Sequence, residues 1–294
     1  MKKLLGALTL SLALSLPAVS QEIHGYEALY GTYINYSGSD VKDYGYSGTA
    51  YLSLGDGREN TFQFGYTRTK IKYKSAPDLD QDDFTLAYTN TNGILENHTF
   101  TFGGHYINSD DDLTDGGYTL FFDGTYSSYS KAYPHSFRWS GGLGFYYTRY
   151  PNTVDFYVFQ FTPHTTFKLF SSYKRGALYL DLTGYSIHVN KSSQVGLSKS
   201  NYYSLEGALR YYYGSYDFKL GGWVGQQVFA VKNGGFVVYN LSEKYRGGAE
   251  FEAGYTFKNG LRVALNVTYN RYKELPTDTN VDQTVITASL GYRF

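Results

Sequence analysis

Alternation of apolar and polar side chains is the dominant pattern of this chain. From Leu261 to Asn270, apolar residues occupy every second position, and Arg, Ala, Asn and Thr lie between them. Residues 249–257 repeat the pattern, and only Lys258-Asn259-Gly260 separates the two segments. Successive side chains of a β-strand point to opposite faces, so a period of two predicts strands with one apolar and one polar face, joined by hairpin turns.

Counting such segments gives about 14 strands, an even number as in single-chain bacterial membrane barrels, with 12 or 16 as alternatives. The eighth segment is the weakest because it contains Pro163, which has no N–H to donate to a neighbouring strand. The expected strand starts are Tyr26, Tyr44, Thr61, Phe84, Thr99, Tyr118, Ser136, Val154, Ala177, Tyr202, Ser215, Lys244, Leu261 and Asp282.

A soluble β-sandwich also alternates, but two features favour a membrane barrel. Apolar stretches often end in Tyr or Phe, as from Phe137 to Tyr147, which is typical of aromatic belts at a membrane interface. Short connections such as Gly55-Asp56-Gly57 alternate with longer polar ones, at 74–83, 108–117, 189–201, 231–243 and 273–282. We therefore expect an all-β fold, a closed antiparallel transmembrane β-barrel with short periplasmic turns and long external loops.

Composition supports this fold and narrows the partners. The chain has 34 Tyr and 20 Phe beside 33 Gly, and it has no Cys. So many aromatic residues with a negative mean hydropathy suit aromatic girdles around a polar interior better than a soluble core. Without disulfides, a large exported domain must depend on hydrogen bonding and burial, as a closed barrel does. The net charge is zero, so no nucleic-acid partner is expected.

The first residues predict export. Lys2 and Lys3 precede an apolar run from Leu4 to Leu16, and Ala18-Val19-Ser20 provides a small-x-small cleavage pattern. We interpret residues 1–20 as a signal peptide cleaved before Gln21, and residues 21–294 as one barrel domain. No later apolar run approaches the roughly 18 residues of a membrane helix. The expected location is the outer membrane of a bacterium.

The final segment strengthens that expectation. Apolar residues alternate up to a C-terminal aromatic, at Thr284, Ile286, Ala288, Leu290, Tyr292 and Phe294. This resembles the targeting strand of Gram-negative outer-membrane proteins, which the barrel-assembly machinery recognises by its terminal aromatic. The whole chain is similar to monomeric porins of about 14 strands, such as OmpG-like and fatty-acid-transporter-like barrels, although no single family is identified. The resemblance implies a monomer surrounded by outer-membrane lipid and lipopolysaccharide, with Tyr292 and Phe294 as the assembly signal and no cofactor.

If the apolar face meets lipid, the other face lines a lumen. The charged residues expected there are Arg138, Lys168, Arg210, Arg246, Arg262, Arg293, Glu206, Asp217, Glu250 and Glu252. Small residues between them leave room for water, and the mixture of signs favours weak charge selectivity. Alternatively, these charges pair across strands and stiffen the wall.

The function expected from this pattern is passive diffusion of small polar solutes through a water-filled lumen. The segment from Val231 to Glu243 contains Phe236 and Tyr239 and is apolar enough to fold inward as a gate. The alternatives are a barrel without transport, for surface binding or envelope anchoring, and an outer-membrane hydrolase.

An enzyme is not expected. None of the six histidines is followed two places on by Ser, as a barrel phospholipase would require, although His105 near the acidic loop leaves a rim site open. No metal site is expected. The acidic loop is interpreted as a solvated loop tip, and a site for a hard cation such as Ca²⁺ is only a weak candidate there. Its carboxylates are Asp110, Asp111, Asp112 and Asp115.

Overall fold

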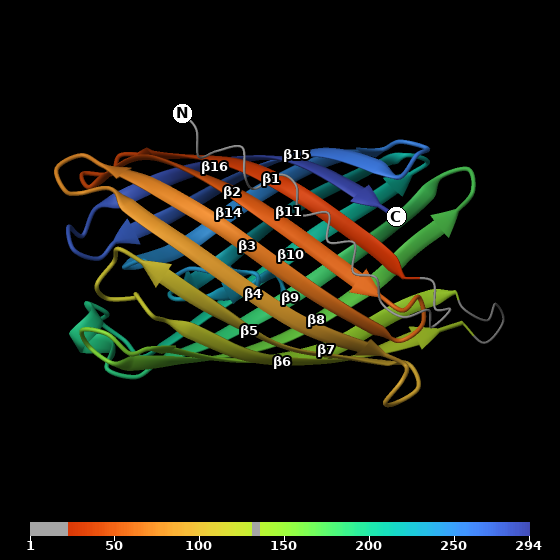
Figure 1. Cartoon of the computed structure of the whole chain (residues 1–294), viewed down its shortest axis with the longest axis horizontal. Helices are drawn as coiled ribbons and strands as arrows, with labels where there is room; N and C mark the ends of the chain where they lie inside the picture. Colours follow the sequence, from red (N-terminus) through yellow and green to blue (C-terminus); the bar gives the residue numbers. More distant parts are fainter. Residues whose placement is uncertain (1–22, 131–135) are drawn as a thin grey trace, which may run out of the picture.

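The computed structural model of this chain describes residues 23–130 and 136–294, so the expected signal peptide lies outside the described residues. Within them, fourteen antiparallel strands close into one barrel (Figure 1). Each strand pairs with its neighbours along the chain, except that β11 pairs with β14, and β1 closes the barrel against β16. The strands are β1 (His24–Ser37), β2 (Lys42–Gly55), β3 (Asn60–Tyr73), β4 (Leu79–Thr91), β5 (His98–Ser109), β6 (Tyr118–Tyr129), β7 (Phe137–Tyr150), β8 (Phe156–Ser172), β9 (Gly176–Val189), β10 (Asn201–Tyr213), β11 (Tyr216–Gln227), β14 (Glu243–Thr256), β15 (Leu261–Glu274) and β16 (Asn280–Arg293).

This confirms the expected fold and the count of fourteen strands, and thirteen of the expected starts lie within two residues of the observed ones. The exception is β4, which begins at Leu79 and not at Phe84. The first residues of β4 are mostly acidic, so the sequence predicted a loop there. They pair with basic residues of β3 instead, Asp80 with Lys70 and Asp82 with Arg68, and these opposite charges support the ladder.

Pro163 does not interrupt β8. On one side it pairs in register with Leu143 of β7. On the other side lies Gly184 of β9, where a Cβ would be 3.2 Å from Cγ of the proline ring. A glycine next to the ring therefore makes room for a residue that a paired strand otherwise disfavours.

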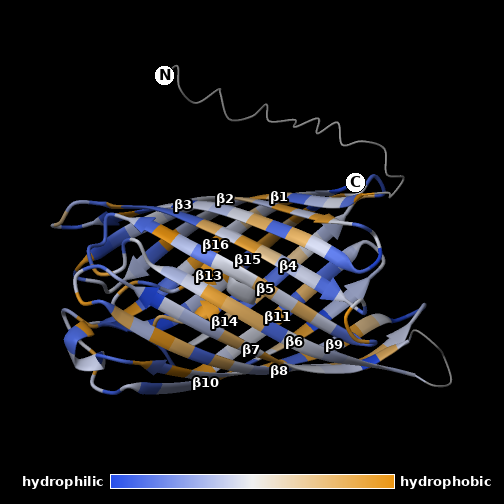
Figure 2. Ribbon diagram, turned by 60° about the horizontal axis from the view of Figure 1, so that its bottom comes forward, coloured by the Kyte–Doolittle hydropathy of each residue, from blue (hydrophilic) through white to orange (hydrophobic). Residues whose placement is uncertain are grey.

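The two faces of the strands differ as the alternation predicts, and hydropathy changes along each ribbon in Figure 2. On β1, Leu29 and Tyr33 are exposed on the outer surface, at 58% and 48%, whereas Tyr30 and Thr32 line the interior. An apolar outer surface around a polar interior is the arrangement of a membrane barrel. Among the described residues, no helix is long and apolar enough to cross a membrane.

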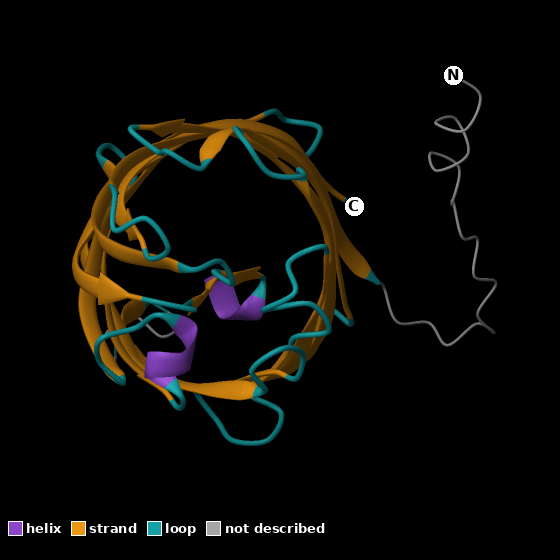
Figure 3. Cartoon of the chain, turned by 90° about the vertical axis from the view of Figure 1, so that its left-hand side faces the viewer, coloured by secondary structure: helices purple, strands orange, loops and turns teal. Residues whose placement is uncertain are grey.

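The two ends of the barrel are different. One end, here called the turn end, carries most of the short connections. The first residue of β1, His24, and the last residue of β16, Arg293, also lie there. The other end, the loop end, carries the connections that follow β1, β3, β5, β7, β9, β11 and β15. It lies on the left in Figure 1 and faces the viewer in Figure 3, where loops and short helical turns lie inside the ring of strands.

The connection between β11 and β14, residues 228–242, enters the lumen. We call it the inner loop. It contains a small hairpin of β12 (Val231–Lys232) and β13 (Val237–Val238), joined by the 3-10 turn η2 (Asn233–Gly235). The other 3-10 turn, η1 (Ser192–Val195), lies in the connection between β9 and β10.

Packing inside the barrel is concentrated towards the loop end. Val228, Phe229 and Ala230 of the inner loop pack in one apolar cluster with residues from β7 to β10, and Tyr239 and Leu241 contact a second cluster on the opposite wall. The barrel residues that become fully buried in this way all lie in the strand halves nearest the loops: Ile107, Tyr150, Phe156, Val158, Ile187, Val189, Tyr202 and Tyr272. Inward residues near the turn end, such as Gln63, Thr101 and Ser289, are only partly buried.

Candidate functional site

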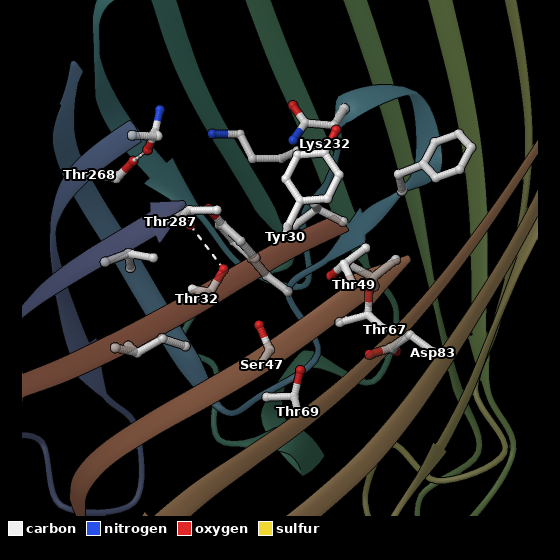
Figure 4. A pocket seen from close by; sticks show the side chains of 18 of the residues that line it. Tyr30, Thr32, Ser47, Thr49, Thr67, Thr69, Asp83, Lys232, Thr268 and Thr287 are labelled. Carbon is white, nitrogen blue, oxygen red and sulfur yellow. Dashed lines mark hydrogen bonds between the residues drawn. The ribbon is translucent and has the colours of Figure 1, made fainter. Parts of the chain in front are cut away.

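The candidate site is the lumen with its inner loop, and its centre is a cavity of about 900 Å³. One wall consists of inward side chains of β1 to β5 and of β14 to β16, and the opposite wall is the inner loop. Figure 4 shows side chains from these elements pointing into the same space, with Lys232 of the inner loop across from Thr32 and Thr49. A closed barrel of this size is wide enough to hold such a cavity.

Several of the expected lumen charges meet partners on other strands of the barrel. Arg210 forms a bidentate pair with Asp181, with Nε–Oδ2 and Nη2–Oδ1 distances of 2.5 and 2.7 Å. Arg262 donates from Nη2 to Asp217 (2.5 Å) and to Glu252 (2.8 Å). Because opposite charges lie so close together, their potentials largely cancel in the lumen, and an ion of either sign is attracted only weakly.

Three further charges make single polar contacts or lie at the mouth of the lumen. Glu250 pairs with Lys219. Lys168 donates to the Ser136 hydroxyl at 2.7 Å. Arg293 lines a smaller cavity at the turn end, beside His24 and Tyr26. These positions agree with the inward phase that the sequence predicts.

Two expected lumen charges lie at strand irregularities. In β14 a bulge between Tyr245 and Gly247 inserts one extra residue, so Arg246 leaves the inward phase of Glu250 and Glu252. Arg246 is exposed, and its Nη1 donates to Asn280 on β16 at 3.2 Å. The expectation for Arg246 is therefore wrong, because a bulge reverses the phase of every residue beyond it. A second irregularity lies between β6 and β7. There Ser128 pairs with Trp139 and the next residue, Tyr129, pairs with Phe137, so that Arg138 is left as the extra residue. Arg138 is exposed at the turn end.

Glu206, the remaining expected charge, binds the inner loop. Its carboxylate lies 2.7 Å from Nζ of Lys232, which also lies 5.5 Å from the ring centroids of Tyr185 and Trp223. Lys232 is mostly buried. A buried lysine needs a carboxylate or aromatic faces around it, and this one has both. Sequence analysis missed Lys232 because it lies in a connection and follows no strand phase.

Hydrogen bonds from barrel side chains fix the inner loop in place. The amide of Gln160 on β8 accepts from the backbone N–H of Val231 (2.9 Å) and donates to the carbonyl of the same residue (2.6 Å). Asn240 donates to Gln81 on β4 (2.7 Å) and to Thr114 (3.0 Å). All of these groups are buried, so losing a partner would leave a polar group unsatisfied.

Aromatic contacts fix the tip of the inner loop. The Phe236 ring packs edge-on against Tyr51 of β2, with the centroids 5.4 Å apart. It lies over Gly65 of β3, where a Cβ would come within 2.9 Å of its Cδ1. Gly235 has φ +94°, and Phe121 of β6 occupies the space beside it. Glycines at these two positions allow the loop to approach the wall closely.

A buried ionic cluster lies where the inner loop returns to β14. Glu243 pairs with Lys42 of β2, and it accepts a 2.5 Å hydrogen bond from the Tyr245 hydroxyl. Lys42 also lies 3.8 Å from Glu274 of β15, which accepts a 2.6 Å hydrogen bond from Ser39. The three charged side chains are each at most 6% exposed, so removal of any one of them would leave a buried charge without its partner.

Two histidines lie in hydroxyl–histidine–carboxylate clusters, which bear on the hydrolase alternative. His105 contacts Thr85 through Nδ1 (2.7 Å) and Asp83 through Nε2 (3.3 Å), both on β4 and not in the acidic loop. His164 contacts Thr125 through Nε2 (2.9 Å). These residues lie within strands, whose backbone N–H groups bond to neighbouring strands and cannot form an oxyanion hole. We interpret both clusters as satisfied polar groups of the wall.

Two carboxylates of the acidic loop, the weak metal-site candidate, bond within the loop. Asp111 accepts a hydrogen bond from the Thr114 hydroxyl (2.6 Å), and Asp115 accepts one from the backbone N–H of Ser109 (3.0 Å), so both carboxylates stabilise the loop itself. Among the residues described, no group of three potential ligands is close enough to hold a metal ion, and Asp110 and Asp112 join none.

Comparison with known proteins shows which structures share this fold. Searches with protein-family models and among curated proteins give no match. Among solved structures, the TodX deltaS2S3 mutant, a monoaromatic hydrocarbon channel, aligns with a TM-score of 0.56 at 9% identity, over 92% of this chain and 90% of that one. The fold is that of the bacterial outer-membrane β-barrels.

Two further neighbours support the same fold. The toluene transporter TbuX of Ralstonia pickettii aligns with a TM-score of 0.54 at 10% identity, over 93% of this chain and 90% of that one. A bacterial polysaccharide outer-membrane secretin aligns with a TM-score of 0.53 at 8% identity, over 92% and 98%. These outer-membrane β-barrels share the architecture with this chain at very low identity, so the function has to be argued from the lumen itself.

Proposed function

We propose that this protein is an outer-membrane channel for the passive diffusion of small polar solutes, with the inner loop limiting passage. The observation that carries this proposal is the cavity of about 900 Å³ inside a closed barrel. Hydroxyl, amide and paired charged groups line it together with aromatic and aliphatic side chains. A cavity of this size, with polar groups among its lining, has room for a small polar solute. The turn end would face the periplasm, and the loop end the outside.

The inner loop is the element that controls such a channel. It packs part of the loop side of the lumen. The cavity runs beside it, from loop-end residues such as Tyr36 and Leu79 to Ser289 nearer the turn end. Its fixed points are the Gln160 amide on Val231, the Glu206–Lys232 ion pair and the Phe236 ring over Gly65. Passage would require this loop to move, and each of these contacts opposes that movement.

The experiment is planar-bilayer recording with the refolded full-length barrel. Gln160→Ala removes the two hydrogen bonds that hold Val231 and should raise the open probability or the conductance several-fold. Gln283→Ala is the matched control, because Gln283 also faces the interior but bonds Asn270 in the barrel wall and not the inner loop. Silence of the wild type and of Gln160→Ala at all voltages, with both barrels folded, would remove the channel proposal.

A second candidate function is a barrel without transport that acts through surface binding or envelope anchoring. The packed loop side of the lumen favours it. The same recordings distinguish the two, because a closed barrel stays silent whether or not Gln160 is present.

A further inference from the structure

Two neighbouring rows of inward side chains cross the wall of the cavity opposite the inner loop. In the first row, Thr32 of β1 pairs in register with Thr287 of β16 and with Ser47 of β2, and Ser47 pairs with Thr69 of β3. In the second row, Thr49 pairs with Thr67. We call these six residues the hydroxyl belt: Thr32, Ser47, Thr49, Thr67, Thr69 and Thr287. Figure 4 shows all six around one space.

The hydroxyl belt both donates and accepts hydrogen bonds. Thr32 and Thr287 bond each other at 2.9 Å, and Thr49 and Thr67 at 2.8 Å. In each pair, one of the two hydroxyl hydrogens makes the bond. The other hydrogen, and the remaining lone pairs of both oxygens, can still bond a solute. All six side chains are half-buried, so they remain accessible from the cavity. A solute whose own groups both donate and accept matches this surface, whereas a hydrocarbon would leave the remaining hydrogens and lone pairs of these hydroxyls without partners.

Aromatic side chains border the belt. Tyr30 lies between Ser289 and Thr49 in the second row, and Tyr51 lies beside it on β2. Phe236 of the inner loop stands edge-on to Tyr51 and lines the same cavity. A sugar ring presents C–H groups on its faces and hydroxyls around its rim. It can therefore place a face against an aromatic ring while its rim bonds the belt.

The charges of the cavity disfavour an anion. Each lysine or arginine that lines it is paired with a carboxylate: Lys232 with Glu206, Lys219 with Glu250, and Arg262 with both Asp217 and Glu252. Asp83 is a further carboxylate of the lining, and it is hydrogen-bonded by Gln81. An anionic solute would meet carboxylates without a free cation to compensate its lost hydration.

We propose that the cavity is a binding site for a neutral polyhydroxylated solute of the size of a mono- or disaccharide, held by the hydroxyl belt and the Phe236 face. This inference rests on the proposed channel function and names its solute class. The volume, about 900 Å³, lies within the range of roughly 300–1,000 Å³ that small-molecule sites occupy.

Binding is measured independently of transport, by saturation-transfer NMR titration of the refolded full-length barrel in a sugar-free detergent. The probes are sucrose as the neutral polyol, gluconate as the anionic polyol, and toluene as the hydrocarbon. Sucrose should bind most tightly. Thr32→Val with Thr49→Val removes two belt hydroxyls at nearly constant shape and should weaken sucrose binding about tenfold. Phe236→Ala should weaken it as well.

The control is Thr119→Val with Thr148→Val. These residues form a buried hydroxyl pair of the same length, 2.8 Å, between β6 and β7, outside the cavity lining. Folding of each variant is checked by its heat-modifiable gel mobility. Equal or tighter binding of gluconate or toluene, or equal losses in the belt and control variants, would overturn the inference. Sucrose binding by a barrel that never conducts would support the site and remove the channel function.

Discussion

Gly25 and Phe294 exchange two backbone hydrogen bonds at the seam where β1 meets β16. The N–H of Gly25 donates to the Phe294 carbonyl (2.7 Å), and the N–H of Phe294 donates to the Gly25 carbonyl (2.9 Å). A Cβ on Gly25 would overlap with the Phe294 ring, so the aromatic side chain lies over a position that only glycine can fill. The aromatic that the sequence suggests as an assembly signal thus also takes part in closing the barrel.

Gly25→Val should displace that ring and weaken the seam, destabilising the barrel by about 1–3 kcal/mol through overpacking. Gly31→Val is the control, because Gly31 lies on the same face of β1 with open space around it. Urea unfolding of vesicle-embedded protein measures both. If the two variants lose equal stability, the ring contact has no special role.

Phe294→Ala tests the assembly signal that resemblance to outer-membrane targeting strands suggests. It should reduce the yield of folded protein assembled by a purified barrel-assembly complex more than it reduces spontaneous refolding into detergent. Tyr292→Ala should act in the same direction. Equal yields from both routes would confine Phe294 to the seam.

The buried cluster of Lys42, Glu243 and Glu274 predicts an asymmetric response to mutation. Lys42→Ala leaves two buried carboxylates without their cation and should cost about 3–5 kcal/mol of unfolding free energy. Lys72→Ala breaks a solvent-exposed pair with Asp78 and should lower the free energy of unfolding far less. Urea midpoints of the two variants check this, and similar losses would contradict the burial argument.

The bulge in β14 predicts which arginine influences ion selectivity. Arg262→Gln leaves Asp217 and Glu252 without their cation in the lumen and should shift the reversal potential in a salt gradient towards cation preference. Arg246→Gln should leave the reversal potential unchanged, because Arg246 lies on the outer side of the barrel. An equal shift for both arginines would show that the bulge does not reverse the phase.

The turn between β2 and β3 predicts a pH dependence. The Asp56 carboxylate accepts hydrogen bonds from the backbone and side-chain N–H groups of Asn60 and from the backbone of Arg58 and Glu59, and these lower its pKa well below the ordinary value. A lowered pKa in the folded state contributes stability above the unfolded pKa of about 4, which is lost as the pH falls further. Asp56→Ala should therefore be less stable than the wild type at pH 7, and the difference in unfolding midpoint should shrink below pH ~4. A constant difference would contradict this.

The sequence alone determined the strands and their faces. Alternation, turn chemistry and aromatic ends are local properties, and a strand's period of two fixes which side chains face each way without knowledge of its neighbours. This is why the strand count, most strand starts and the inward positions of Arg210, Arg262 and Glu206 followed from the pattern. The interior apolar clusters did not follow, because an inward Tyr or Val has the same phase whether it meets water or a loop.

The sequence indicated that residues 231–243 could fold inward, but only the tertiary structure decided how they fill the lumen. The inner loop follows no period, so its conformation depends on contacts with distant strands, such as Gln160 on Val231 and Glu206 on Lys232. The bulge that turns Arg246 outward leaves no mark in the alternation, since it arises from pairing with β15. The hydroxyl belt likewise exists only through register: Thr32, Ser47 and Thr69 lie on three strands, and the closure of the barrel brings Thr287 beside them.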